Sequence, residues 1–246
     1  MSIHILRRNN RRFSAGEYSG TYPPDVLDNL ISAWPGNGNT NDVYGLNPGV
    51  SEGGVTSYGT GLNGLRCFNS GGTGQFITTT NLVNPILLAG YSFSAWFNTT
   101  ATGGFPIVYM DQSQISGGSI YDKTFGINAS GNIYWAIFNG GPYGLIYTGK
   151  TYNDGLWHHA VINTNNSNFS QIYVDGVSVI TGQGNGSNYA GYWKIGMNHY
   201  ATYPIGTITA GDPFYFNGSL QDMRYYGATL TLTQVLALYQ NGPRIA

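Results

Sequence analysis

Charge is what this sequence has least of. Asp, Glu, Lys and Arg make up 9% of its 246 residues, whereas about a quarter is usual in soluble domains. Four of the ten basic residues lie at the start of the chain, Arg7, Arg8, Arg11 and Arg12. From residue 13 onward the chain carries six basic and eleven acidic side chains. This body lacks the basic patch that nucleic-acid binding requires, so we expect no nucleic-acid contact through it.

Cysteine and long apolar runs are also scarce. Cys67 is the single cysteine, which excludes an internal disulfide framework, and we expect its thiol to fill a small apolar space. No run of about eighteen apolar residues occurs, so the sequence predicts no membrane-spanning helix. The first arginines follow a short apolar piece, the reverse of the order in a secretory signal. We therefore expect synthesis without signal-dependent export and incorporation into an extracellular particle such as a virion.

Short β-forming runs separated by turn residues account for most of the chain from residue 26 onward. Apolar residues make up 41% of the sequence, and glycine (37) and tyrosine (20) are abundant. Runs such as 91–100, 132–139 and 158–164 are rich in Val, Ile, Phe, Tyr and Thr, and Asp175-Gly176 marks a tight turn. About a dozen such runs, without intervening helical patterns, predict one all-β domain, a sandwich or barrel, over residues 26–246.

Two segments depart from this β pattern. Residues 1–25 form a basic N-terminal arm that has too few apolar groups to build a core. Its arginines are either a solvated tail or a docking arm that becomes ordered on another protein subunit. Near the C-terminus, Thr231 and Gln234 make a capping-box pattern before an apolar run, and Asn241-Gly242 provides a stop. These signals predict one short helix of about two turns.

The tripeptide Trp-His-His at residues 157–159 raises the question of a metal or catalytic site. Neighbouring side chains on a strand point to opposite faces, so His158 and His159 cannot bind one metal ion together. The other histidines, His4 and His199, stand in no zinc-ligand pattern with them. We therefore expect one imidazole inside the sandwich, donating to a backbone carbonyl, and the other on the outer surface.

The stretch DGLWHHAVINTNNSNFSQIYVDGVSV, residues 154–179, resembles the laminin-G-like jelly-roll domains of the concanavalin A-like lectin/glucanase superfamily. Three further stretches are similar to this family in the right order: an Asn- and Gly-rich opening segment (30–45), a central strand (91–99) and a closing strand with a short helix (215–239). The resemblance covers residues 27–242. It implies a jelly-roll β-sandwich of two antiparallel sheets with one short C-terminal helix, preceded here by the extended N-terminal arm.

Hydrolysis of glycosides is the first activity that the resemblance raises. It needs two carboxyl groups about 5 Å or roughly 6.5–9.5 Å apart, and the family's glucanases place theirs on one strand as Glu-x-Asp-x-x-Glu. The chain has only two glutamates, Glu17 in the arm and Glu52 in a Gly-rich loop, and neither lies in such a pattern. The two histidines lack the nucleophile-elbow sequence of a serine hydrolase. The sequence therefore predicts no enzymatic activity.

A structural calcium ion is a second property that the resemblance implies. The family often holds calcium where the opening segment meets the closing strand, and Asp42 and Asp222 occupy the matching positions. Calcium takes about six to eight oxygen ligands, which carboxylates and loop carbonyls supply. The alternative is that Asp42 caps a turn and that Asp222 hydrogen-bonds backbone amides near Arg224.

Aromatic residues set among Asn and Gly are the candidate ligand-binding groups. Flat rings can stack on sugar rings while amides bind hydroxyl groups, which suits a neutral glycan. The candidates are Tyr143, Tyr189, Tyr192, Trp193, Tyr200 and Tyr203. The same residues would also serve a protein interface, where Tyr and Trp are enriched, or simply pack within the loops.

These features together predict a non-catalytic recognition or structural module. We expect a surface-displayed component of a larger assembly, such as a virion or fibre, anchored by its basic arm and able to bind glycan. Its partners would be other protein subunits, through the arm, and host or environmental glycans. The alternatives are a free-standing carbohydrate-binding lectin or adhesin, and a degenerate glycoside hydrolase, because this fold hosts all three.

Overall fold

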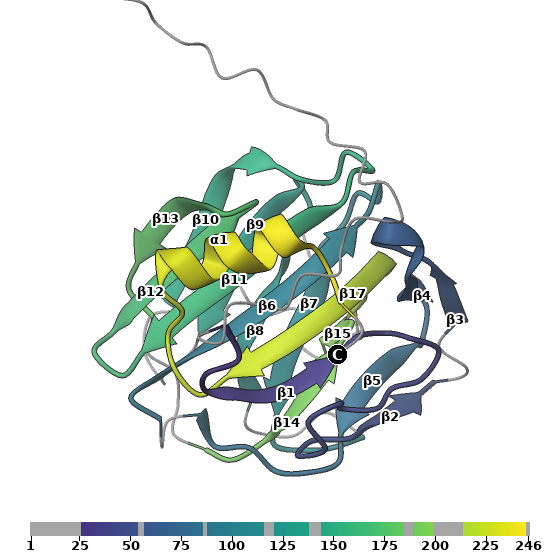
Figure 1. Ribbon diagram of the computed structural model, residues 1–246, viewed down its shortest axis with the longest axis horizontal. Helices are drawn as coiled ribbons and strands as arrows, with labels where there is room; N and C mark the ends of the chain where they lie inside the picture. The colour runs from purple at the N-terminus through teal and green to yellow at the C-terminus, as the bar shows by residue number, and fades with distance from the viewer. Residues whose placement is uncertain are drawn as a thin grey trace, which may run out of the picture.

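Two antiparallel sheets packed face to face make up the body of the molecule (Figure 1), as seen in a computed structural model. The structure describes residues 26–53, 57–85, 88–115, 121–137, 144–184, 189–198 and 214–244. Residues 1–25, the basic arm, lie outside the described residues. The all-β sandwich expected from the sequence is confirmed.

The first sheet has eight strands, seven of them in one row. In order across the sheet these are β13 (Val177–Gly182), β12 (Phe169–Val174), β11 (His158–Asn165), β6 (Gly90–Asn98), β17 (Asn217–Tyr226), β4 (Arg66–Gly71) and β3 (Ser57–Thr60). The eighth strand, β1 (Leu30–Trp34), pairs with residues 223–226 of β17, beyond residues 217–220, which pair with β4. Strand β17 therefore joins three neighbours, β6, β4 and β1.

The second sheet has seven strands and lies behind the first in the view of Figure 1. In order these are β10 (Gly144–Thr151), β9 (Asn132–Ile137), β8 (Tyr121–Ile127), β7 (Phe105–Asp111), β14 (Tyr192–Ile195), β5 (Phe76–Thr79) and β2 (Gly49–Glu52). A small two-stranded sheet, β15 (Met197–Asn198) and β16 (Phe214–Tyr215), and a 3-10 turn at Leu62–Gly64 complete the described elements besides the helix.

Every second side chain of the strands points into the core between the sheets, and aromatic rings dominate this core. On β6, Phe93 and Phe97 point into this core, and the ring of Phe93 lies 6.1 Å from that of Trp34 and 5.4 Å from that of Trp193, between centroids. Tyr225 of β17 contacts Phe93 as well, at 6.0 Å. Such aromatic pairs add about 0.5–1.5 kcal/mol each beyond the apolar area that they bury.

Helix α1 (Leu232–Asn241) closes the outer face of the first sheet, lying across β11 and β12 in Figure 1. Its buried side chains include Val235 and Leu238, which belong to a second apolar cluster with Val161, Tyr173 and Tyr226 of the sheet. The outer face of this sheet is therefore a second core. Among the described residues, no helix is long and apolar enough to cross a membrane.

The ends of α1 follow the sequence signals, although the helix is longer than expected. The Thr231 hydroxyl accepts from the backbone N–H of Gln234, and the Gln234 side chain accepts from the backbone N–H of Thr231, which completes the capping box. Gly242 ends the helix at a φ of 69°, a value that favours glycine. The ten residues make nearly three turns rather than two, because the apolar contacts with the sheet continue to the last turn.

The turn between β12 and β13 also forms where the sequence predicts it. Asp175 and Gly176 both have positive φ, 51° and 78°, as a two-residue hairpin turn of this type requires. The Asp175 carboxylate does not stay in solvent but bonds to the start of β11, since its Oδ1 accepts from the backbone N–H of His159 at 3.0 Å. The turn thus places a carboxylate beside the two adjacent histidines.

Candidate functional site

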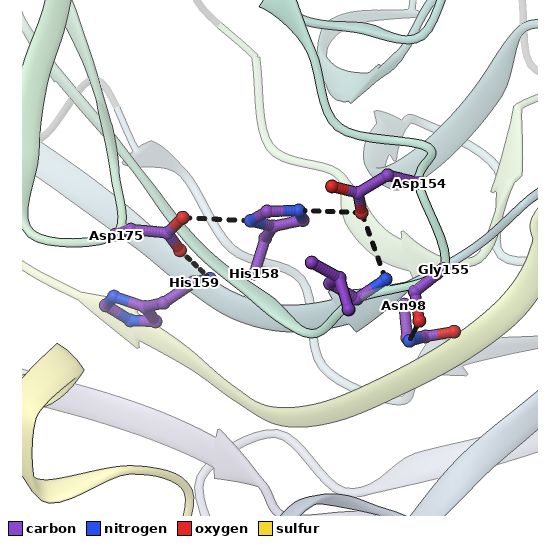
Figure 2. A network of polar contacts seen from close by, with 7 residues as sticks. Asn98, Asp154, Gly155, His158, His159 and Asp175 are labelled. Carbon is purple, nitrogen blue, oxygen red and sulfur yellow. Dashed lines mark hydrogen bonds and ion pairs between the residues drawn. The ribbon is translucent and has the colours of Figure 1, made fainter. Parts of the chain in front are cut away.

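His158 lies between two aspartates, each from a different loop (Figure 2). Its Nδ1 is 2.9 Å from Oδ2 of Asp175, and its Nε2 is 3.1 Å from Oδ1 of Asp154. Asp154 is fixed in turn by the backbone N–H of Leu156, which donates to the same Oδ1 at 3.0 Å. We call these three side chains the His158 clamp, because they tie loop 152–157 to the β12–β13 turn.

The two carboxylates make the imidazole of His158 easier to protonate. Burial opposes the charged form, but the hydrogen bonds and charges of Asp175 and Asp154 outweigh it and raise the pKa of His158 above 6.5. The pKa of Asp154 is lowered from 3.8: its partial burial acts the other way, but the bonds from Leu156 and His158 prevail. The clamp is therefore most stable when it holds an imidazolium between two carboxylates.

His159 occupies the opposite environment, beneath helix α1. Its side chain is 1% exposed, and its ring packs beside two aromatic rings that also stack on each other, Trp96 of β6 at 5.0 Å and Tyr239 of the helix at 6.4 Å, between centroids. Its Nε2 is 2.8 Å from the Ser94 hydroxyl, while its Nδ1 has no hydrogen-bond partner among the described residues. Burial, assisted by the charge of Arg224, lowers the pKa of His159 to about 3. The imidazole is therefore neutral at ordinary pH.

The histidine pair thus divides between the two faces of the sheet, as strand alternation predicts. The partners differ from expectation, because His158 bonds to carboxylates rather than to a backbone carbonyl. The outward-facing imidazole of His159 is also the more buried of the two, because helix α1 covers it. Asp154 lies only four residues before His158 and was visible in the local sequence, whereas the covering of His159 by helix α1 depends on a segment distant along the chain.

The clamp does not have the arrangement of a hydrolytic site. A glycosidase leaves room for a sugar or a water between its two carboxyl groups, whereas the His158 ring fills the position between Asp154 and Asp175. Both ring nitrogens are engaged, so neither is available to a substrate. In the part of the chain that the structure describes, no group of three or more His, Cys, Asp and Glu is placed to hold a metal ion. The clamp is a structural device.

The Asp42 carboxylate is saturated by backbone amides. Its Oδ1 accepts from the N–H groups of Ala33 and Tyr44, both at 2.9 Å, and its Oδ2 accepts from the N–H of Asn47 at 2.8 Å. These bonds fold residues 42–47 into a fixed loop against β1. This is the turn-capping alternative for Asp42, and it leaves little of the carboxylate for a cation.

Asp222 is likewise occupied by protein donors. Arg224 binds it through two nitrogens, Nε to Oδ1 at 2.8 Å and Nη2 to Oδ2 at 3.1 Å, and the backbone N–H of Arg244 donates to Oδ2 at 3.1 Å. A guanidinium group thus stands where the family resemblance places calcium. The donor set of Asp42 and Asp222 does not fit a shared calcium ion, because each carboxylate is already neutralised or hydrogen-bonded.

The structure corrects two of the six candidate ligand-binding residues. Trp193 is completely buried between the sheets, and Tyr189 is 8% exposed, with its hydroxyl donating to the Met110 carbonyl. Both belong to the core, so neither ring can stack on a ligand in this arrangement. Tyr192, at the start of β14, is half-buried and keeps an accessible part. The other three, Tyr143, Tyr200 and Tyr203, lie outside the described residues.

Two buried ion pairs were not anticipated. Lys194 lies 3.3 Å from Asp111 across β14 and β7, and both side chains are fully buried. Lys123 lies 2.5 Å from Asp122 on β8, and its ammonium is 4.5 Å from the centre of the Tyr189 ring. Burial lowers the pKa of both lysines, while the neighbouring carboxylates oppose this effect. The sequence did offer one signal for these pairs. Lysine and aspartate residues lie inside β-forming runs, although the chain as a whole has few charged residues.

The two histidines should give opposite dependences of stability on pH. The folded pKa of His158 lies above 6.5, so its stabilisation is fully present below pH 6.5 and is lost as the pH rises through the folded pKa. The His158→Gln variant should be less stable than the wild type by about 1 kcal/mol near pH 6. This difference should shrink as the pH rises, when unfolding free energies are measured in urea.

His159 supplies the matched comparison on the same strand. Because its pKa is lowered to about 3, the unfolded chain binds a proton below pH 6.5 that the folded chain does not. Wild-type stability should therefore fall on acidification, by up to about 1.4 kcal/mol per pH unit from this group. His159→Gln should remove that slope. Equal pH profiles for the two variants would contradict the assignment of a charged and a neutral histidine.

Removal of calcium should leave the protein unchanged. Since Asp42 and Asp222 are held by protein donors, melting temperatures with calcium and with a chelator should coincide in the wild type. Asp42→Asn should still lower the melting temperature under both conditions, because it weakens the bonds to three backbone amides. A chelator effect in the wild type that is absent from Asp42→Asn would show instead that a cation binds there.

Solved structures with the same fold come from proteins of different origin. Domain 4 of AbnA, an extracellular GH43 arabinanase from Geobacillus stearothermophilus solved in complex with arabinotriose, superimposes with a TM-score of 0.61 at 17% identity, covering 84% of this chain and 96% of that one. The binding domain of botulinum neurotoxin DC in complex with SialylT gives a TM-score of 0.63 at 15% identity, covering 87% and 52%. At these identities the likeness shows the fold alone.

A third similar structure is the binding domain of botulinum neurotoxin serotype D/C VPI 5993, with a TM-score of 0.63, 18% identity and coverage of 87% and 52%. The chain thus spans about half the length of the neurotoxin binding domains that it matches.

No curated protein matches the sequence. A laminin G family model, described as the concanavalin A-like lectin/glucanases superfamily, matches residues 70–236. With this match across most of the sandwich, the protein belongs to the concanavalin A-like lectin/glucanases superfamily.

Proposed function

We propose that the protein is a non-catalytic recognition module that binds a neutral glycan and is displayed on a larger assembly. The observation that supports glycan binding is the fold that the chain shares with two domains solved with carbohydrate, arabinotriose in one and SialylT in the other. The low charge of the chain agrees with a neutral ligand, which is bound through ring stacking and amide hydrogen bonds rather than ion pairs.

The contacts that the aspartates make within the protein support the absence of catalysis. Catalytic carboxyl groups must face the reacting bond, one as acid and one as base or nucleophile. Asp111 and Asp122 are buried in ion pairs with lysines, Asp222 is bound by Arg224, and Asp154 and Asp175 hold His158. The carboxylates that the fold brings together are therefore used to stabilise it. This favours a binding module over the degenerate glycoside hydrolase.

Tyr192 is the described residue that we assign to glycan binding. It begins β14, and its partner across the ladder is Asp111 of β7. Its ring retains accessible surface, in contrast to the adjacent Trp193. Tyr143, Tyr200 and Tyr203, which lie in sequence stretches with many Asn and Gly residues, complete the proposed set.

Glycan binding should be detectable without turnover. A screen of immobilised neutral oligosaccharides should yield a ligand, and Tyr192→Ala should weaken its binding by about tenfold, as expected from the loss of one stacking contact. Tyr147→Ala is the matched control, because Tyr147 is a tyrosine of β10 that is 54% exposed and lies outside the proposed set. Incubation with the bound glycan should release no reducing ends above a heat-treated control.

Two outcomes would contradict this proposal. If no oligosaccharide binds, or if Tyr147→Ala weakens binding as much as Tyr192→Ala, the glycan site is wrongly assigned. If reducing ends are released and a single Asp substitution abolishes their release, the protein is an enzyme.

The assembly context is the second part of the proposal, and it depends on the arm. Arg7, Arg8, Arg11 and Arg12 repel one another on a free segment, and guanidinium groups form bidentate bonds with carboxylates of a partner. The described residues build an aromatic core of their own, and we expect this core to keep the sandwich folded without the arm. The arm is therefore proposed as the anchor and the sandwich as the displayed domain.

Deletion of residues 1–25 tests this division of roles. The truncated protein should remain folded, with nearly the same melting temperature, and should still bind the glycan identified in the screen. It should fail to join its native assembly, and the attachment of the full chain should weaken as salt is added, because salt screens the arginine contacts. Normal incorporation of the truncated protein would show that the arm is not the anchor.

A further inference from the structure

Four aromatic side chains in the core between the sheets carry polar atoms that are left without a protein partner. They are the hydroxyls of Tyr91 and Tyr225 and the indole N–H groups of Trp135 and Trp193, and none of these atoms has a hydrogen-bond partner among the described residues. All four side chains are at most 4% exposed. Buried polar atoms in folded proteins are almost always paired, with protein or with ordered water. These four atoms therefore need a further partner.

The four rings form one group around Tyr91. The centroid of its ring lies 6.4 Å from that of Trp135, 6.3 Å from that of Trp193 and 6.1 Å from that of Tyr225. Trp193 and Tyr225 also contact each other, at 5.4 Å. The two tyrosines belong to the first sheet and the two tryptophans to the second. The unpaired atoms thus lie in one region that both sheets line, which we call the central polar site.

A distortion of β8 brings a buried ion pair to the same part of the core. Lys123 has a φ of 61°, and the pairing of β7 with β8 shifts its register beside this residue. Such a bulge changes the direction in which side chains point. The Lys123 ammonium pairs with Asp122 and lies 4.5 Å from the centre of the Tyr189 ring, which belongs to the core between the sheets.

The carboxylate of this ion pair acts on the central polar site. Burial raises the pKa of Tyr91, and the charge of Asp122 adds to the effect. A carboxylate has this influence on a buried hydroxyl only when it is near it. Any occupant of the site must therefore be compatible with a negative charge close by.

The chemistry of the four groups defines which occupant they accept. An indole N–H only donates, whereas a phenol hydroxyl both donates and accepts, so the site presents four donors and two acceptor oxygens. No two of these groups are hydrogen-bonded to each other, although their rings are in contact. The missing partner must accept hydrogen bonds. An anion would be repelled by Asp122, and a metal ion has no use for indole donors, so a neutral acceptor remains.

We propose that ordered water occupies the central polar site and joins the two sheets through hydrogen bonds. A buried water makes about three hydrogen bonds. It can accept from an indole of the second sheet and bond to a hydroxyl of the first, and these bonds are nearly as favourable as direct ones. The core is then partly a hydrogen-bonded network that fixes how one sheet lies on the other. The inference does not depend on glycan binding or on the arm.

Nuclear Overhauser effects between water and the indole protons test this inference. In the full-length protein, isotope-labelled at its tryptophans, the Hε1 protons of Trp135 and Trp193 should both show cross-peaks with water. Their sign in rotating-frame spectra should be that of direct contact rather than of proton exchange. Trp34 is the matched control, because it is completely buried but its Nε1 donates to the Asn47 carbonyl at 3.0 Å. Its Hε1 should show no such cross-peak.

Removal of single hydroxyls gives a second test, in which a hydrated and a dry core predict opposite signs. If water pairs with the hydroxyls, Tyr91→Phe and Tyr225→Phe each remove hydrogen bonds and should increase the equilibrium constant for unfolding about fivefold. In a dry core each substitution would delete an unpaired hydroxyl and decrease that constant. Tyr189→Phe is the reference, because its hydroxyl donates to the Met110 carbonyl, and its loss should also favour unfolding.

Three results would overturn the inference. The first is the absence of a water cross-peak at either Trp135 or Trp193, or a cross-peak of equal strength at Trp34. The second is a gain of stability in Tyr91→Phe or Tyr225→Phe. The third is a small organic molecule that is released in stoichiometric amount when the protein is denatured and is identified by mass spectrometry, which would assign the site to that molecule.

Discussion

Strand β6 must satisfy two buried environments at once, and much of the structure follows from this constraint. Its residues are buried along almost the whole strand, because the second sheet covers one face and helix α1 covers part of the other. The face toward the second sheet is apolar and aromatic. The face toward the helix carries Ser92, Ser94 and Trp96. The two buried serine hydroxyls need hydrogen-bond partners. Asn163 and His159 of β11 supply them, at 2.6 and 2.8 Å.

The neutral state of His159 follows directly from this arrangement, and so does the contrast with His158. His158, one residue earlier on β11, turns its side chain to the other face, where two carboxylates reach it. Two identical side chains, adjacent in the sequence, thus acquire opposite pKa shifts. The cause in each case is the segment that covers the residue, a helix for one and two turns for the other.

Local patterns were sufficient to predict the elements whose signals are themselves local. The Asp175-Gly176 turn and the capped ends of α1 depend on backbone conformations that a few residues specify. Trp193 and Lys194 are neighbours on β14, so their side chains point to opposite sides of the sheet. Which of these sides is sealed from solvent depends on distant segments, and this is why Trp193 was assigned to a ligand site and the Lys194–Asp111 pair was missed.

Most aspartates of the described chain are used in internal contacts, whereas Asp28, Arg66 and Lys150 are exposed. The aspartates at 42, 111, 122, 154, 175 and 222 each bind a protein donor. At Asp222 the cation is the guanidinium group of Arg224, which binds the carboxylate through two nitrogens.

The place of β17 in the first sheet has a consequence for how the chain folds as it is synthesised. Strands β1, β4 and β6 all precede residue 99, yet β4 and β1 are joined to β6 only through β17, residues 217–226. Until that late strand emerges from the ribosome, the earlier strands have unpaired edges, which are prone to pair with other chains. Closure of the sheet is then a late, long-range event of the kind that makes β-proteins fold slowly. The nascent chain must stay soluble for most of its synthesis before its central strand is available.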